Sequence, residues 1–124
     1  CGNKGCLEAY CSGWAIAKRY YEFTKCKKMP SDIEKEAKND PKGVAYKIYK
    51  EAGKYLGVGL ANIIDIFDPE AIVVGGGLGG SELLFKFGLT DMRKRMFLKK
   101  PQTVIKRSKL GNKTAMIGAA FIFA

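Results

Sequence analysis

The most constraining feature of this chain is a short apolar run that ends in a glycine-rich turn, AIVVGGGLGGS at residues 71–81. The consecutive apolar, mostly β-branched residues predict a buried strand over Ala71–Val74. The glycines allow a sharp turn with positive φ, and Ser81 can cap a helix that continues through Phe87 towards Phe97. The segment therefore predicts a strand, a turn and a helix in direct succession.

This segment is also a candidate phosphate or nucleotide site. Glycines let backbone N–H groups approach a ligand, and the N-terminus of the following helix adds a partial positive charge. The segment lacks the acidic residue that follows a dinucleotide fingerprint by about 20 positions, and it lacks the Lys and Ser or Thr of a P-loop. On this segment alone, a tight turn without a ligand is the alternative interpretation.

Apolar residues at helical spacing predict four further helices. Ser31 and Glu34 form a capping pair at the start of the second. The third contains Gly53, Gly57 and Gly59, each of which costs up to about 1 kcal/mol against alanine, so we expect another segment to approach closely there. The last helix is apolar almost all round and is expected to be buried between layers. The predicted elements are helices at 7–23, 31–40, 42–67 and 113–123 and a strand at 103–106.

Length and charge limit the class of protein. A chain of 124 residues with 47% hydrophobic content has room for one globular domain. No stretch reaches about 18 apolar residues and no secretion signal opens the chain, so we expect no membrane span and a cytoplasmic location. The net charge of +10 implies attraction to anionic ligands or polyanions. Because the basic residues are scattered, with clusters only at 25–28 and 93–100, charge alone does not establish nucleic-acid binding.

Four cysteines and the absence of histidine limit the metal chemistry. Cys1 and Cys6 lie in a C-x-x-x-x-C arrangement whose flanking glycines could bring two thiolates to one zinc ion. Two ligands do not hold a structural zinc, so a complete site needs Cys11 or Cys26, or ligands that precede residue 1. Glu8 either stabilises the start of the first helix or accepts hydrogen bonds from the hydroxyl groups of a ligand.

Three segments, taken in order, resemble the C-terminal half of the ROK family of repressors, open reading frames and sugar kinases: CGNKGCLEAYCSG, GLANIIDIFDPEAIVVGGG and LGNKTAMIGAA. The resemblance spans essentially the whole chain. It implies an α/β fold, helix-rich with a few short strands, which is the C-terminal lobe of an actin-like ATPase of the ribonuclease H-like or hexokinase type. Residues 1–124 are then expected to form a single domain that begins inside the zinc-binding motif.

The resemblance also gives roles to site residues. The family's zinc motif has the form C-x-C-G-x-x-G-C-x-E and follows a histidine ligand, so Cys1 and Cys6 match its second and third cysteines as Zn²⁺ ligands. Glu8 matches the glutamate that binds sugar hydroxyls. Cys11 and Cys26 match no ligand and are expected to be structural. The segment that lies against the adenosine and inner phosphates of ATP matches three glycines, Gly75, Gly76 and Gly77.

No catalytic residue is assigned within this chain. In the family the catalytic base is an aspartate of the N-terminal lobe, and phosphate loops of that lobe and Mg²⁺ handle the transferred phosphoryl group. The expected function is therefore part of an ATP-dependent hexokinase or glucokinase-type sugar kinase, inactive without its N-terminal lobe. Its expected partners are the sugar, ATP, that lobe and, as in many family members, further copies in a homo-oligomer.

Two other functions stay open from the sequence. The first is a ROK-type transcriptional regulator, which carries an N-terminal DNA-binding helix-turn-helix and uses the sugar as inducer. The kinase is preferred because the glycine motif for ATP is intact. The second is a binding or assembly module without chemistry, which pairs through its helices or attracts nucleic acid through its charge. The sequence does not identify the sugar, because most sugar-contacting residues of the family precede residue 1.

Overall fold

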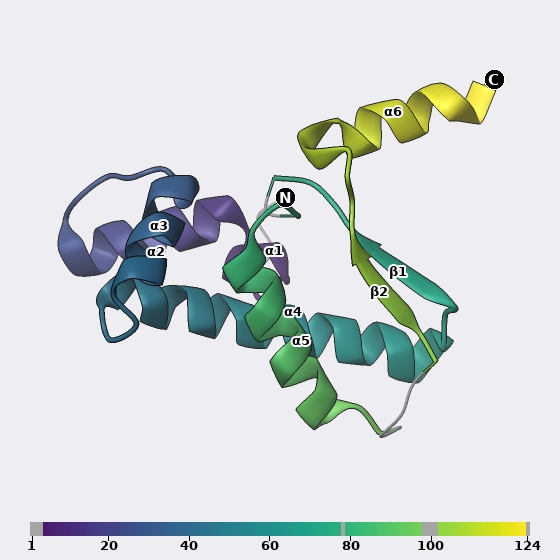
Figure 1. Ribbon diagram of the computed structural model, residues 1–124, viewed down its shortest axis with the longest axis horizontal. Helices are drawn as coiled ribbons and strands as arrows, with labels where there is room; N and C mark the ends of the chain where they lie inside the picture. The colour runs from purple at the N-terminus through teal and green to yellow at the C-terminus, as the bar shows by residue number, and fades with distance from the viewer. Residues whose placement is uncertain (1–3, 78, 98–101, 124) are drawn as a thin grey trace.

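A long central helix organises the molecule. The structure is a computed structural model that describes residues 4–77, 79–97 and 102–123. Helix α4 (Val44–Phe67) is crossed by α5 (Glu82–Arg95), with α2 (Gly13–Thr24) and α3 (Pro30–Asn39) at one end and strands β1 (Ala71–Val74) and β2 (Val104–Arg107) at the other (Figure 1). The remaining elements are α1 (Glu8–Cys11), η1 (Gly111–Lys113), α6 (Thr114–Ala120) and η2 (Phe121–Phe123).

Strands β1 and β2 pair in parallel, and α5 forms the connection between them. The strand predicted at 71–74 is confirmed, and the second begins at Val104, one residue later than predicted. The prediction that β1 is buried was wrong. Ile72 and Val74 pack against residues of α4 and α5, whereas the Val73 side chain is 62% exposed. Within the described residues the helices cover only one face of the sheet.

Glycines let α4 and α5 meet backbone to backbone. A Cβ atom at Gly57 would stand 2.8 Å from the Met92 nitrogen and 2.9 Å from the Gly88 oxygen. At Gly53 the same addition would collide with Phe87. The close approach predicted for the glycines of the long helix is therefore confirmed. Their cost in helix propensity is offset by the contact they permit.

Two hydrophobic clusters lie along α4. The first joins α2, α3, the N-terminal half of α4 and the start of α5, and the second joins the C-terminal half of α4 to the later part of α5. Their buried members are Ile16, Tyr20, Ile33, Ala37, Ala45, Ile48, Tyr49, Ala52, Leu83 and Leu84 in the first, and Leu60, Ala61, Ile64, Met92 and Met96 in the second. Both ends of α5 are thus held against the central helix.

The predicted first helix is broken at Ser12. This residue has extended backbone angles (φ −80°, ψ 165°), and its hydroxyl oxygen accepts a hydrogen bond from the Ala15 N–H at 3.1 Å. Ser12 therefore ends α1 and caps α2. A single helix over 7–23 was wrong, because serine followed by glycine favours a new N-terminus.

The capping pair predicted at the start of α3 was also wrong. Met29 is the N-cap residue, Pro30 occupies the first turn, and no side chain caps the helix. Ser31 therefore lies inside the helix. The Glu34 carboxylate instead accepts a hydrogen bond from the Leu83 N–H of α5 at 3.0 Å. A carboxylate near the N-terminus of a neighbouring helix satisfies an unpaired donor there and interacts well with the helix dipole.

The C-terminal segment projects from the body of the molecule (Figure 1). Its helices cover the predicted range, but burial between layers was wrong for this chain. Met116 is 66% exposed, Phe121 73% and Ile122 74%. An all-round apolar helix needs partners on every side, and the described residues supply few of them. None of the helices in the described ranges has the length and apolar character required to cross a membrane.

We predict that Gly57→Ala destabilises the chain more than Gly59→Ala. At both positions, alanine favours the helix over glycine by the same amount, about 1 kcal/mol. The new Cβ at Gly57 meets backbone atoms of α5, whereas at Gly59 it meets the end of the flexible Leu7 side chain at 2.7 Å. Overpacking against backbone costs about 1–3 kcal/mol. Urea unfolding followed by circular dichroism measures both variants, and equal midpoints would contradict the packing described for Gly57.

The Glu36 carboxylate of α3 is hydrogen-bonded both to α2 and to the loop between the two helices. Glu36 accepts hydrogen bonds from the Lys28 ammonium at 2.6 Å and from the Tyr20 hydroxyl at 2.7 Å. These two bonds, with Lys28 first, hold the pKa of the Glu36 carboxyl below its ordinary value of 4.5. Because the folded pKa is depressed, the stabilisation is present above that value and is lost as the pH falls through the folded pKa.

We therefore predict that Glu36→Gln lowers the unfolding midpoint at pH 7 and that the difference from wild type disappears at pH values well below 4.5. Urea titrations at several pH values measure the difference. Lys28→Gln is the matched variant. It removes the Lys28–Glu36 bond, the stronger of the two, and its unfolding midpoint should show the same pH dependence. A deficit of Glu36→Gln that persists in strong acid would show that the carboxylate is not the source of the stabilisation.

Candidate functional site

A hollow of about 660 Å³ brings together segments that lie far apart in the sequence. Its volume falls within the range of small-molecule sites, roughly 300–1,000 Å³. Three of its sides come from α1, from the start of α3 and from the glycine turn after β1. The lining residues are Leu7, Glu8, Cys11, Ser12, Gly13, Met29, Pro30, Ser31, Leu56, Val74, Gly75, Gly77, Gly79 and Leu84. Glu8, Gly75 and Gly77, which the sequence singled out, thus face the same hollow.

The glycine turn has a conformation that requires glycine at two positions. Gly76 has φ +80°, in the left-handed region that other residues rarely adopt. At Gly79 a Cβ atom would stand 2.8 Å from the Gly75 backbone, and the Gly79 N–H donates to the Gly76 oxygen at 3.1 Å. The chain therefore folds back on itself directly after β1. Gly76 supplies the turn without itself lining the hollow.

The N-terminus of α5, which follows this turn, already has partners for two of its N–H groups. Ser81, only 4% exposed, accepts from the Leu84 N–H at 3.2 Å, which confirms the predicted cap. The Leu83 N–H donates to Glu34. Because a carboxylate and a hydroxyl already occupy these donors, the first turn of α5 offers less to a phosphate than the sequence suggested. The turn's own backbone is the better candidate.

Glu8 begins α1 and is exposed at the edge of the hollow. Within the described part of the chain its carboxylate has neither a hydrogen-bond nor an ion-pair partner. It is the one acidic residue among those that line the hollow. An ionised carboxylate in this position can accept hydrogen bonds from the hydroxyl groups of a ligand.

Two contacts hold α1, and hence Glu8, against α4. The Leu7 side chain lies over Gly59, where a Cβ would stand 2.7 Å from its Cδ2 atom. The Tyr10 ring stacks on Tyr55 with centroids 4.2 Å apart. The Arg19 guanidinium lies over both rings and donates to the Tyr10 carbonyl at 3.2 Å. A helix of one turn is thereby fixed by packing rather than by its own hydrogen bonds.

The described residues do not fit a zinc ion. Cys1 lies outside them, and Cys6 is exposed just before α1. Cys11 is half-buried, its thiol donates to the Leu7 carbonyl at 3.4 Å, and burial raises its pKa against the opposing effect of Arg19. A thiol in this state is a poor ligand, since zinc binds the thiolate.

No group of three Cys, Asp, Glu or His side chains suited to a metal occurs in the described ranges. Cys26 is exposed and belongs to neither hydrophobic cluster. Within those ranges, no three such side chains that include Cys6 together with Cys11 or Cys26 lie close enough to share a metal ion. The zinc roles of Cys1 and Cys6 stay predictions.

Sequence reasoning missed the contribution of α3 to the hollow. Ser31 was predicted only as a helix cap, yet Met29, Pro30 and Ser31 all line the same hollow as the glycine turn. The local pattern carries no signal for this placement, because it depends on how α3 packs against α4 and α5. The apolar side chains of Leu56 and Leu84 also line the hollow, and the helical pattern gave no sign of this placement.

Sequence comparison relates the whole chain to one family. The ROK family matches residues 1–124. The chain is 30% identical over 141 residues to a glucokinase of Streptomyces coelicolor, an alignment that covers 97% of this chain and 44% of the relative. It is also 30% identical over 122 residues to an N-acetyl-D-glucosamine kinase of Vibrio cholerae, covering 98% of this chain and 40% of that protein. The chain thus spans less than half the length of these relatives.

Solved structures give the same result for the fold. A ROK family glucokinase from Streptomyces griseus, in complex with glucose and AMPPNP, superposes with a TM-score of 0.82 at 27% identity, over 98% of this chain and 45% of that one. A ROK family transcriptional regulator, a homologue of the E. coli MLC protein, superposes with a TM-score of 0.76 at 27% identity, over 98% and 34%. The predicted α/β, helix-rich fold of the actin-like ATPases is confirmed. The chain therefore belongs to the ROK family.

Proposed function

We propose that this chain is the C-terminal, nucleotide-binding lobe of an ATP-dependent sugar kinase. The observation that carries the proposal is that Glu8 and the glycine turn at 75–79 line one hollow although some 70 positions separate them. A sugar kinase must hold a sugar hydroxyl beside the terminal phosphate of ATP. A carboxylate and a backbone turn that face the same space meet that requirement.

The glycine turn is proposed to hold ATP. Gly75 and Gly77 present backbone to the hollow without side chains, so their N–H groups can approach phosphate oxygens closely, whereas the Gly79 N–H is held by the Gly76 carbonyl. Leu84, Met29 and the Pro30 ring supply apolar walls of the same space, as a nucleoside requires. The glucokinase that superposes on this chain was crystallised with AMPPNP, which supports ATP as the phosphoryl donor.

Glu8 is proposed to bind and orient the sugar. Its carboxylate accepts hydrogen bonds from sugar hydroxyls, and the packing of α1 on α4 fixes where those hydroxyls lie relative to the nucleotide. Among the described residues that line the hollow, Glu8 is the one carboxylate, so those residues offer no second acidic group as general base. The base, the Mg²⁺ ligands and the groups around the transferred phosphoryl are proposed to come from an N-terminal lobe.

Two exposed apolar surfaces are consistent with contact to a second lobe. Val73 leaves one face of the sheet uncovered, and α6 exposes Met116. Surfaces of this kind commonly meet another domain. A single lobe supplies only part of a cleft, so we propose that residues 1–124 alone do not turn over ATP. We also propose a cytoplasmic location, because ATP is the co-substrate. Association into a homo-oligomer stays a prediction.

A sugar-responsive regulator is the second candidate. It is favoured by the superposition on a ROK family transcriptional regulator. The kinase is preferred because two sequence relatives at 30% identity are sugar kinases and because glycines of the turn line the hollow. Catalytic turnover separates the two functions, since both can bind a sugar.

We predict that Gly79→Ala weakens binding of AMPPNP by about tenfold or more, whereas Gly80→Ala does not. The added methyl at Gly79 collides with the Gly75 backbone and displaces the turn, but at Gly80 it meets nothing within 4 Å. A displacement of this kind removes about one charge-assisted hydrogen bond, worth roughly 1.5–3 kcal/mol. Isothermal titration calorimetry on the 124-residue chain measures both variants. Equal affinities would remove the glycine turn from the nucleotide site.

We predict that Glu8→Gln raises the KM for the sugar by about tenfold or more and leaves the KM for ATP within about twofold. The amide loses the charge that strengthens its bonds to sugar hydroxyls. Steady-state ADP formation by the uninterrupted protein that contains this chain provides both constants. Glu22→Gln, an exposed change on α2 away from the hollow, is the control. A sugar KM that Glu8→Gln leaves unchanged would contradict the role of this residue.

A further inference from the structure

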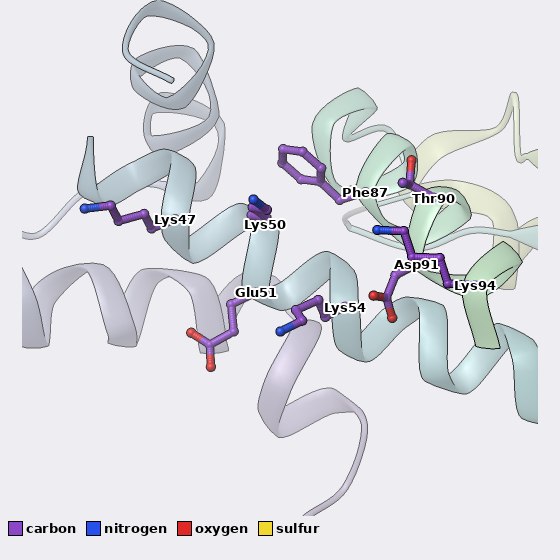
Figure 2. A pocket seen from close by; sticks show the side chains of 8 residues that line it. All are labelled: Lys47, Lys50, Glu51, Lys54, Phe87, Thr90, Asp91 and Lys94. Carbon is purple, nitrogen blue, oxygen red and sulfur yellow. The ribbon is translucent and has the colours of Figure 1, made fainter. Parts of the chain in front are cut away.

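A second hollow, of about 400 Å³, lies where α4 and α5 cross. We call it the lysine groove. It is lined by Lys47, Lys50, Glu51, Lys54, Phe87, Thr90, Asp91 and Lys94 (Figure 2). It shares no residue with the hollow at Glu8. Positions 47, 50 and 54 recur at three and four along α4, so their side chains leave the same face of the helix.

The positive charge of the lysine groove is only partly compensated by the protein. Four lysines face two carboxylates, a net of +2. One of these carboxylates, Asp91, forms an ion pair with Arg95. The other, Glu51, extends away from Phe87 and Thr90 (Figure 2). None of the ion pairs among the described residues involves the four lysines of the groove.

Two lysines of α3, by contrast, have carboxylate partners at helical spacing. Lys38 bonds Glu34 and Glu82, and Lys35 bonds Asp32. In the lysine groove, Lys50 instead lies three residues after Lys47 and four before Lys54, which are spacings at which like charges repel. Glu51, four residues after Lys47 and three before Lys54, offsets part of this repulsion, and an anion between the lysine side chains would relieve the rest.

The remaining lining groups indicate the chemical class of that anion. Phe87 is half-buried and offers an apolar wall. The Thr90 hydroxyl donates to the Lys86 carbonyl at 2.8 Å, and the same oxygen can still accept a hydrogen bond from a ligand hydroxyl. Lysine ammonium groups are point charges that suit phosphate oxygens. An anion with a hydroxyl-bearing or ring-shaped body can pair with the lysines, contact Phe87 and reach the Thr90 hydroxyl.

We propose that the lysine groove binds a phosphorylated small molecule. This site goes beyond the proposed function and does not depend on it. A nucleic acid fits less well, because the three lysines of α4 span only about 10 Å at a rise of 1.5 Å per residue. Four lysines are also fewer than the roughly 6–10 phosphate contacts of a typical DNA-binding protein.

Titration of the ¹⁵N-labelled chain with inorganic pyrophosphate tests the proposal. Amide spectra are expected to show saturable shifts at Lys50, Phe87 and Thr90. The triple change Lys50→Gln, Lys54→Gln, Lys94→Gln is expected to weaken this binding by about tenfold or more, since it removes three charge contacts. A second triple serves as control: Lys4→Gln, Lys109→Gln, Lys113→Gln. Its net charge, +10 less three, equals that of the first triple, and it is expected to bind pyrophosphate as the unmodified chain does.

Three results would overturn the proposal. Equal weakening in both triples would mean attraction to overall charge. Shifts confined to the amides of 75–79 would assign the anion to the glycine turn. Shifts at the groove with the polyanion heparin, but none with pyrophosphate, would identify a polymer as the occupant. All the exchanged lysines are exposed, and the amide spectra without ligand verify that each variant is folded.

Discussion

The backbone contact between α4 and α5 is the constraint on which the rest of the structure depends. Gly57 on one helix and Gly88 on the other allow an approach that any side chain would prevent. This approach places the start of α5 beside α3, where Glu34 bonds its Leu83 N–H. The glycine turn lies between β1 and α5, so both of its ends are fixed. The placement of the turn therefore depends on the packing of α5 against α4, and its conformation depends on Gly76 and Gly79.

Helix α4 sets the other side of the hollow as well. Gly59 makes room for Leu7, and Tyr55 stacks on Tyr10, so a helix of one turn holds Glu8 in place. Glycine at three positions therefore costs helix propensity and in return positions the two parts of the site. A different stretch of the same helix carries Lys47 and its neighbours. Helix α4 therefore contributes to both the hollow at Glu8 and the lysine groove.

The sequence predicted those features that depend on local pattern. The strand at 71–74, the cap at Ser81 and the close approach at Gly57 were all predicted correctly. Side-chain partners far apart in the sequence were not predictable. Glu34 was expected to cap its own helix and instead bonds α5, because tertiary packing brings that donor nearer. The apolar pattern of 113–123 predicted a helix, but periodicity does not say what covers it, and in this chain it is exposed. The family resemblance identified Glu8 and the glycines, and only the packing showed that they share a hollow.

Sugar-dependent ADP release decides most directly between a kinase and a regulator. It is measured on a protein that joins this chain to an N-terminal lobe, with ATP, Mg²⁺ and a panel of glucose, N-acetylglucosamine, mannose, fructose and no sugar. We expect ADP release that requires one or more of these sugars and that is absent when residues 1–124 are assayed alone. A folded protein that binds a sugar but releases no ADP with any of them would contradict the proposed kinase function. The fold would then serve a regulator that responds to the sugar without phosphorylating it.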